Sequence, residues 1–158
     1  MRELAARVLT KTRKRWFKTH PLFESHAPVT SSELERIEKK VGITLPADLQ
    51  DWLLSVGYGD VDESLSFRYD WFSRVERGAL LGAVIFAQDE LGNFYAYSPK
   101  DWSIMFVSRS ASKLTTVAPS FLAFMEELER RDFKLEYWMD SLPSEPYRSD
   151  ASQETPLK

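Results

Sequence analysis

The sequence predicts an α+β domain whose central sheet is mostly antiparallel, has about four to six strands and is flanked by helices. Residues 30–56 and 119–130 carry apolar side chains at the three- and four-residue steps of amphipathic helices. Between them, residues 82–107 carry β-branched and aromatic runs separated by glycine and proline turns, which is typical of consecutive strands. Helices near the ends and strands in the middle favour segregated layers over an alternating, parallel arrangement.

A two-helix unit is predicted at the start of this region. Thr30 or Ser32 can cap the first helix, because a glutamate follows each of them at the spacing of a capping box. Gly42 stands where a helix C-terminus favours glycine, and Pro46 stands where the first turn of the next helix tolerates proline. Gly57 ends the second helix. The inward-facing residues are Leu34, Ile37, Val41, Leu49, Trp52, Leu53 and Val56.

The clearest β signal is a hairpin. Residues 82–88 are rich in Val, Ile and Phe, and residues 93–97 alternate in character after a turn that contains Gly92. Three further strands are predicted: a weak one near 65–69, one at 102–107 and a short one at 114–117.

One C-terminal helix is predicted to follow Pro119. Its apolar face is formed by Phe121, Phe124, Met125 and Leu128. Residues 133–139 fit either an extension of this helix or an edge strand. We therefore divide the chain into a basic N-terminal arm and connection (1–29), a domain (30–140) and a polar C-terminal tail (141–158).

The formal net charge of −3 hides an uneven distribution. Residues 1–20 hold seven Lys or Arg and one Glu, whereas residues 21–139 hold twelve Lys or Arg and nineteen Asp or Glu. An acidic body attracts cationic partners and repels phosphates, so we expect no direct contact between it and nucleic acid. The basic run at residues 11–18 is interpreted as the solvated face of a surface helix over residues 1–20. Contact with nucleic acid or an anionic membrane is the alternative.

A cytoplasmic protein without a membrane segment is expected. The chain has no Cys, which excludes disulfides, a thiol nucleophile and a zinc–thiolate site. Its longest apolar run, residues 79–87, is too short to cross a bilayer as a helix. Residues 1–20 lack the apolar region of a secretory signal. They are Arg-rich and nearly free of acids, however, so a mitochondrial presequence is the alternative to a surface helix.

Motifs for catalysis or metal binding fail on their spacing. His20 and His26 are the only histidines and lack the spacing of metal ligands. Residues 60–64 resemble the start of a calcium loop, but Leu65 and Trp71 occupy the positions that need Gly and Glu. Phosphate-binding and serine-nucleophile motifs are absent from the sequence. We therefore expect no catalytic residues, no metal, no cofactor and no small-molecule ligand.

Two acidic loops are the candidate protein-binding surface. Their carboxylates are Asp60, Asp62 and Glu63 in one loop and Asp89 and Glu90 in the other. Tyr58 and Tyr69 are the candidate aromatic anchors, because aromatic side chains dominate interface energetics. The alternatives are that the carboxylates are ordinary solvated loop residues and that the aromatics, including Trp71 and Phe72, belong to the core.

Four segments in a fixed order resemble the SUKH superfamily, which includes fungal Smi/Knr cell-wall regulators and many bacterial immunity proteins. The segments are an amphipathic helix before Gly42-Ile43-Thr44-Leu45-Pro46, the helix Asp48-Leu49-Gln50-Asp51-Trp52-Leu53-Leu54 that ends in Gly57 and Gly59, the hairpin at 86–95 and the helix at 118–125. The resemblance covers residues 30–130. One departure is Tyr58, which separates glycines that are often adjacent in the family.

The resemblance implies a non-enzymatic domain that binds proteins. The first hypothesis is an immunity protein that binds and neutralises a cognate toxin, most simply a basic nuclease or other nucleic-acid-modifying toxin. The second is a regulatory or scaffold protein of the cell-wall-regulator type, without a toxin partner. The third is an enzyme or nucleic-acid binder that uses the basic arm. The sequence leaves the oligomeric state open.

Overall fold

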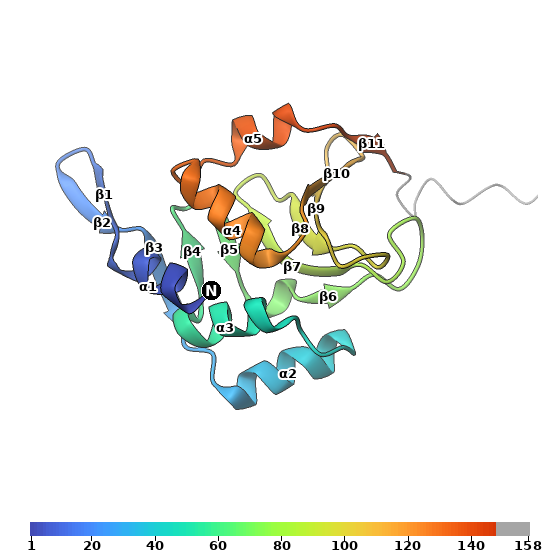
Figure 1. Cartoon of the computed structure of the whole chain (residues 1–158), viewed down its shortest axis with the longest axis horizontal. Helices are drawn as coiled ribbons and strands as arrows, with labels where there is room; N and C mark the ends of the chain where they lie inside the picture. Colours follow the sequence, from blue (N-terminus) through green and yellow to red (C-terminus); the bar gives the residue numbers. More distant parts are fainter. Residues whose placement is uncertain (148–158) are drawn as a thin grey trace, which may run out of the picture.

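The computed structural model describes residues 1–147, and its largest element is a nine-stranded sheet in which every strand pair is antiparallel (Figure 1). Eight strands follow one another across the sheet in chain order. They are β3 (Phe23–Ala27), β4 (Tyr58–Val61), β5 (Leu65–Phe67), β7 (Val84–Asp89), β8 (Phe94–Tyr97), β9 (Ile104–Ser108), β10 (Lys113–Ala118) and β11 (Glu145–Pro146). The short β6 (Ser73–Arg74) pairs with β7.

The α+β class is confirmed, but the predicted size of four to six strands is wrong. The hairpin predicted around Gly92 is present as β7 and β8. The additional strands β3, β4, β6 and β11 have two to five residues and lack a period-two apolar pattern. Their backbone groups pair with strands that are already formed, so nothing local in the sequence reveals them.

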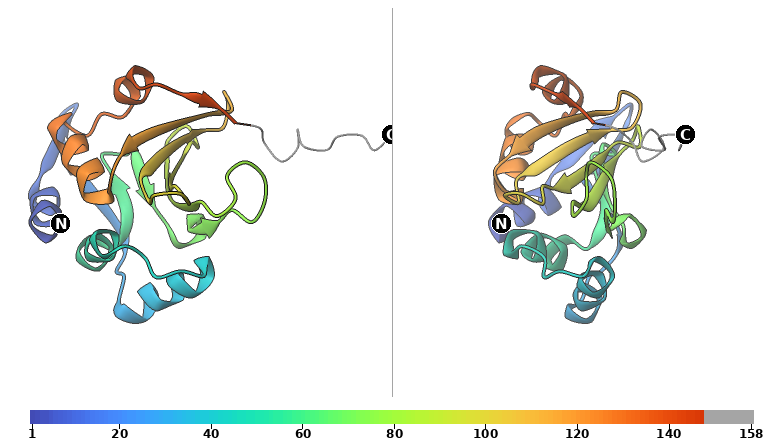
Figure 2. Two further views of the ribbon diagram at one scale, coloured as in Figure 1. Left: turned by 45° about the vertical axis from the view of Figure 1, so that its right-hand side comes forward. Right: turned by 90° about the vertical axis from the view of Figure 1, so that its right-hand side faces the viewer.

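Helices cover one face of the sheet (Figure 2). α1 (Arg2–Thr10) packs on α3 (Ala47–Val56), which also contacts α2 (Ser31–Val41) and α4 (Phe121–Arg130). Trp52 of α3 is completely buried at the centre of this layer. Its ring lies 5.7 Å from Phe67 of β5 and 6.1 Å from Phe121 of α4, between ring centroids. One aromatic cluster therefore joins the helices to the middle of the sheet.

The predicted two-helix unit is present, with its boundaries where the capping residues indicated. The Glu33 backbone N–H donates to the Thr30 side chain, with 3.2 Å between nitrogen and oxygen. Gly42 ends α2 in the left-handed conformation, with φ of 73°. Gly59 in β4 has a different role, because a Cβ added there would lie 2.2 Å from the Glu24 carbonyl oxygen. The glycines after α3 thus let β3 lie close against β4.

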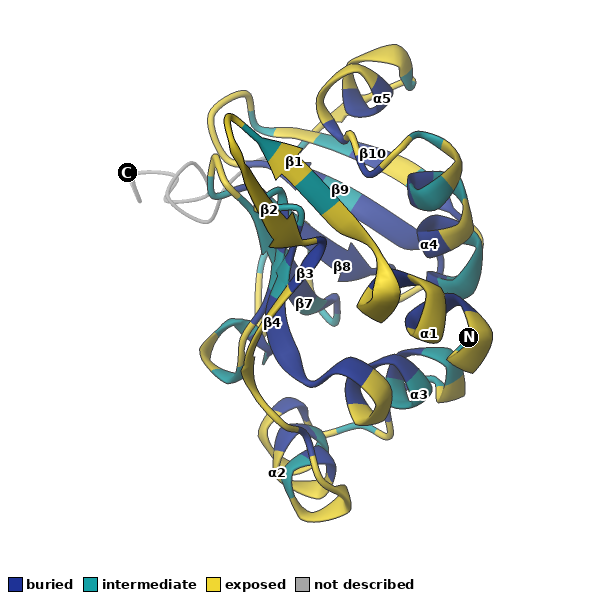
Figure 3. Ribbon diagram, turned by 90° about the vertical axis from the view of Figure 1, so that its left-hand side faces the viewer, coloured by how far each residue is buried: buried dark blue, intermediate teal, exposed yellow. Residues whose placement is uncertain are grey.

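The prediction of a helix over residues 1–20 is wrong beyond Thr10. The chain turns into a separate antiparallel hairpin formed by β1 (Thr12–Arg15) and β2 (Lys18–Pro21) (Figure 3). Leu4, Ala5 and Val8 of α1 are buried in the main core. The N-terminal segment is thus partly a structural element of the domain and partly an exposed hairpin.

The prediction of a single C-terminal helix is also wrong, because α5 (Glu136–Ser141) follows α4 as a second short helix. Leu142–Tyr147, assigned to the polar tail, lie within the described residues, and β11 pairs with β10. The Tyr147 hydroxyl donates to the Ser108 carbonyl oxygen over 3.0 Å. The rest of the predicted tail, 148–158, lies outside the described residues.

Across residues 1–147, every helix is too short or too polar to cross a lipid bilayer.

Candidate protein-binding surface

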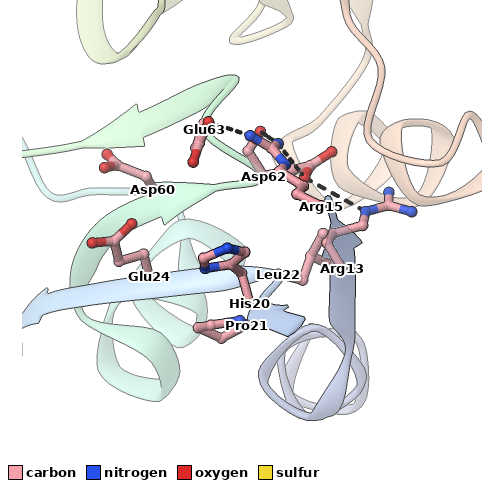
Figure 4. Close-up of a pocket in the computed structure, with 9 residues that line it drawn as sticks. All are labelled: Arg13, Arg15, His20, Pro21, Leu22, Glu24, Asp60, Asp62 and Glu63. Carbon is pink, nitrogen blue, oxygen red and sulfur yellow. Dashed lines mark hydrogen bonds and ion pairs between the residues drawn. The ribbon is translucent and has the colours of Figure 1, made fainter. Parts of the chain in front are cut away.

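The carboxylates of the β4–β5 turn are paired with the N-terminal hairpin. Asp62 lies 3.1 Å from Arg15 and 3.5 Å from Arg13, between charged atoms, and Glu63 forms an ion pair with Arg15 (Figure 4). Arg13 also reaches Asp132 beyond α4, at 2.7 Å. The basic arm therefore neutralises acids of its own domain.

Asp60 lies on the sheet face opposite the main helical layer and also has cationic neighbours. Its carboxylate is 2.9 Å from the His26 ring nitrogen and 3.6 Å from Arg68. Burial acts to raise its pKa, but hydrogen bonds from Ser66 and His26 outweigh this and hold the pKa below its usual value. Asp60 thus has cationic neighbours within its own domain, although its Oδ1 accepts no hydrogen bond among the described residues.

A small cavity of about 200 Å³ lies between the hairpin and β4 (Figure 4). It is lined by Arg13, Arg15, His20, Pro21, Leu22, Glu24, Asp60, Asp62 and Glu63. Three of its four carboxylates, Asp60, Asp62 and Glu63, already have cationic partners within the domain, so the cavity offers little unpaired charge to a ligand.

The two candidate tyrosine anchors lie beside α2, away from the acidic turns. Tyr58 is buried, and its hydroxyl donates to the Glu33 carboxylate over 2.8 Å. Tyr69 is half-buried, with Arg36 at 4.1 Å and Lys40 at 4.5 Å from its ring centroid. Phe72 is core, as the alternative interpretation held. These aromatic rings are held by the domain's own side chains.

The second acidic loop combines a structural and a free carboxylate. Asp89 accepts hydrogen bonds from the backbone N–H groups of Leu91 and Asn93, both at 3.0 Å, and so fixes the β7–β8 turn. Glu90 at the turn's tip is exposed and has no ion-pair partner within residues 1–147. Glu90 is therefore available to a partner, whereas Asp89 orders the loop that presents it.

An open groove of about 460 Å³ lies between this turn and α5. The floor is apolar and aromatic, and is formed by Tyr95, Phe106, Phe133, Leu135 and Met139. The charged lining consists of Asp62, Asp89, Glu90, Glu136 and Asp140, opposed by Lys134 alone. We call this feature the acidic groove. Leu91 and Tyr137 also line it and are 79% and 78% exposed, so the groove has apolar as well as negative edges.

Three of the five predicted acids, Asp62, Asp89 and Glu90, line the acidic groove, whereas Asp60 and Glu63 do not. The sequence does not identify Glu136, Tyr137 and Asp140 as site residues, because residues 133–139 fit both a helix and an edge strand. The four-residue step from Glu136 to Asp140 is the signal that a helical assignment would have used.

The polar side chains of the acidic groove are mainly carboxylates. Residues 1–147 contain no group of three or more His, Asp or Glu side chains arranged to hold a metal ion. The groove's charged groups are nearly all carboxylates, and the hydroxyl of Ser64 in its lining donates to the carbonyl oxygens of Val61 and Phe133. The arrangement suits recognition of a cationic, partly apolar surface.

Comparison with known proteins gives a family but no individual relative. No curated protein and no solved structure matches the chain significantly. The model of the SMI1/KNR4 family (SUKH-1) matches residues 28–127, a segment that runs from just after β3 to within α4. This agrees with the resemblance carried by the two-helix unit, the β7–β8 hairpin and the closing helix. Because the match covers more than half of the sequence, the chain belongs to the SMI1/KNR4 family (SUKH-1).

Proposed function

We propose that this protein is a non-enzymatic immunity protein that binds a basic toxin and blocks it sterically. The observation that carries the proposal is the acidic groove, an open depression with an apolar floor and an excess of carboxylates. Family membership is consistent with a protein-binding role, because the SUKH resemblance implies immunity proteins among its members. A nuclease toxin is basic where it binds phosphates, so its active face would complement this groove.

The structure refines which residues we assign to the contact. Glu90, Glu136 and Asp140 are exposed and have no ion-pair partner among the described residues. Asp60, Asp62 and Glu63 are secondary candidates, because a toxin would have to compete with arginines of the same chain. Arg15 pairs with Asp62 and Glu63, and Arg68 pairs with Asp60. Tyr137 and Leu91 replace Tyr58 and Tyr69 as the proposed apolar anchors.

The test is charge reversal at the groove. We expect Glu90→Lys/Asp140→Lys to raise the Kd for the toxin encoded beside this gene about 10- to 100-fold at low salt, since each of the two lost charge pairs is worth roughly 0.7–1.4 kcal/mol. The dependence of affinity on salt should also flatten. Isothermal titration against the catalytically inactivated toxin measures both effects.

The matched control is Glu35→Lys/Glu76→Lys, which changes the net charge equally at exposed positions outside the groove. Equal losses of affinity in the two pairs would mean that only overall charge matters, and would remove the groove as the contact. A neighbouring gene product that does not bind the wild-type protein would contradict the immunity role itself.

A further inference from the structure

The tip of the N-terminal hairpin presents two aromatic side chains to solvent. Trp16 and Phe17 connect β1 to β2 and are 93% and 97% exposed. We call the hairpin, residues 12–21, the aromatic finger; it projects away from the sheet at the left of Figure 1. Burying two such rings elsewhere would remove much apolar surface from water, so the tip is suited to insertion into an apolar site.

The base of the finger is fixed before any partner arrives. Arg13 and Arg15 point toward the body, where they meet Asp132, Asp62 and Glu63. Lys14 and Lys18 flank the tip, are exposed and have no ion-pair partner within residues 1–147. The finger is therefore a preorganised, positively charged projection with an apolar end, and ordering it on binding costs little entropy.

The acidic groove has the complementary properties. Its floor is apolar, its charged lining consists of five carboxylates and one lysine, and its volume is about 460 Å³. Trp16 and Phe17 do not line it, so the molecule's own finger leaves it open. Asp62 lines the groove and also pairs with Arg15 at the base of the finger. The finger and the groove therefore lie on neighbouring parts of one surface.

We propose that two copies of this chain associate by reciprocal exchange, the aromatic finger of each copy entering the acidic groove of the other. Adjacent, complementary features on one surface can satisfy each other around a two-fold axis, which closes the assembly as a dimer. The four aromatic side chains alone would bury roughly 600–1,000 Å², and the groove edges add to this. The total approaches the lower end of stable interfaces, so a micromolar, salt-sensitive dimer is expected.

A membrane is a poorer occupant for the finger. The body behind the tip is acidic, and an anionic lipid surface would repel it. Two free lysines and two aromatic rings would provide only weak, reversible attachment.

The experiment is sedimentation velocity of the full chain from 2 to 300 μM, at 50 and 500 mM NaCl, without toxin. The wild type should shift from monomer to dimer with concentration, and its Kd should rise at least tenfold at the higher salt. Trp16→Ala/Phe17→Ala should remain monomeric. Leu81→Ala, which removes an exposed apolar side chain outside the groove, should dimerise like the wild type.

Charge exchange separates specific docking from loss of folding. Lys14→Glu/Lys18→Glu makes the finger tip negative, and Glu90→Lys/Glu136→Lys/Asp140→Lys makes the groove positive, because its lining then holds two carboxylates and four lysines. Each variant alone should be monomeric, whereas an equimolar mixture should form a heterodimer, because both finger–groove contacts then join opposite charges. No folding defect would produce that recovery.

A wild-type chain that stays monomeric at 300 μM overturns the proposal, whether or not it sediments with phosphatidylserine vesicles or binds a toxin. A dimer that persists in both charge variants, or a mixture that fails to associate, overturns it as well. Because the measurement uses the purified chain alone, failure here leaves the toxin-binding proposal to its own test.

Discussion

At the scale of single residues, two buried tyrosine hydroxyls have opposite environments. The Tyr58 hydroxyl donates to Glu33, whereas the Tyr97 hydroxyl has no partner among the described residues. Burial is the largest cause that raises the pKa of each above its usual value near 10. The folded state therefore retains these phenolic protons, and the resulting stability is present below pH 10 and is lost as the pH rises beyond it.

We predict that Tyr58→Phe lowers the free energy of unfolding by about 1 kcal/mol, because the half-buried Glu33 carboxylate loses one of its two donors and keeps only Arg36. Tyr97→Phe should change stability by less than about 0.5 kcal/mol or raise it, because it removes an unsatisfied buried group. Urea unfolding at pH 7 measures both. Equal losses in the two variants would mean that the Tyr97 hydroxyl has a partner in solution.

The sequence identifies which residues carry the charges of the site. It does not show which of these charges pair with each other. The acids of the loops at 60–63 and 89–90 are visible in the sequence, and three of them line the acidic groove. Arg15 and Asp62 are 47 positions apart, and nothing local indicates that the arm folds back to meet this turn. The long-range ion pairs show which acids are already paired within the domain and which remain available to a binding partner.

At the scale of elements, α1 shows why the arm is part of the domain. Leu4 is buried against the main core, whereas Leu9 in the same helix is 47% exposed. The apolar residues at positions 4, 5 and 8 fit the helix that the sequence predicts, but that prediction continued to residue 20, ten residues beyond the end of α1. β1 and β2 have no apolar alternation, and their pairing is supported by ion pairs to distant acids.

Leu4→Ala should therefore lower the free energy of unfolding by about 2–5 kcal/mol, as expected for a fully buried leucine. Leu9→Ala, the same change five residues later, should cost less than about 0.5 kcal/mol. Thermal or urea unfolding of the two variants measures the difference. A small effect at Leu4 would contradict the docking of α1 on α3. Deleting residues 1–20 is consequently a poor test of the basic arm, because the deletion removes core side chains along with its cations.

At the scale of the whole molecule, the family region is smaller than the folded unit. Residues 28–127 exclude β3 and β11, the two outer strands of the sheet, and α5. The periodic helices and the central hairpin could be predicted because their signals are local. The outer strands could not, because strands this short are defined by their neighbours.

We predict that a chain trimmed to residues 28–127 aggregates, because β4 and β10 become unprotected edges and the buried partners Phe23 and Trp138 are lost. A chain of residues 1–147 is the control and should remain soluble and unfold cooperatively. Static light scattering and thermal unfolding compare the two. A monomeric 28–127 chain that melts within a few degrees of the control would mean that the outer strands are dispensable.

The strict succession of strands from β3 to β11 also bears on how the protein is made. After β3, each strand finds its partner in the strand synthesised just before it, so the sheet can grow outward as the polypeptide leaves the ribosome. Two pairs are exceptions, because α2 and α3 separate β3 from β4, and α4 and α5 separate β10 from β11. Pairing of this first strand across an intervening helical pair has the largest loop to close in the sheet, and we expect it to limit the rate at which the native state forms.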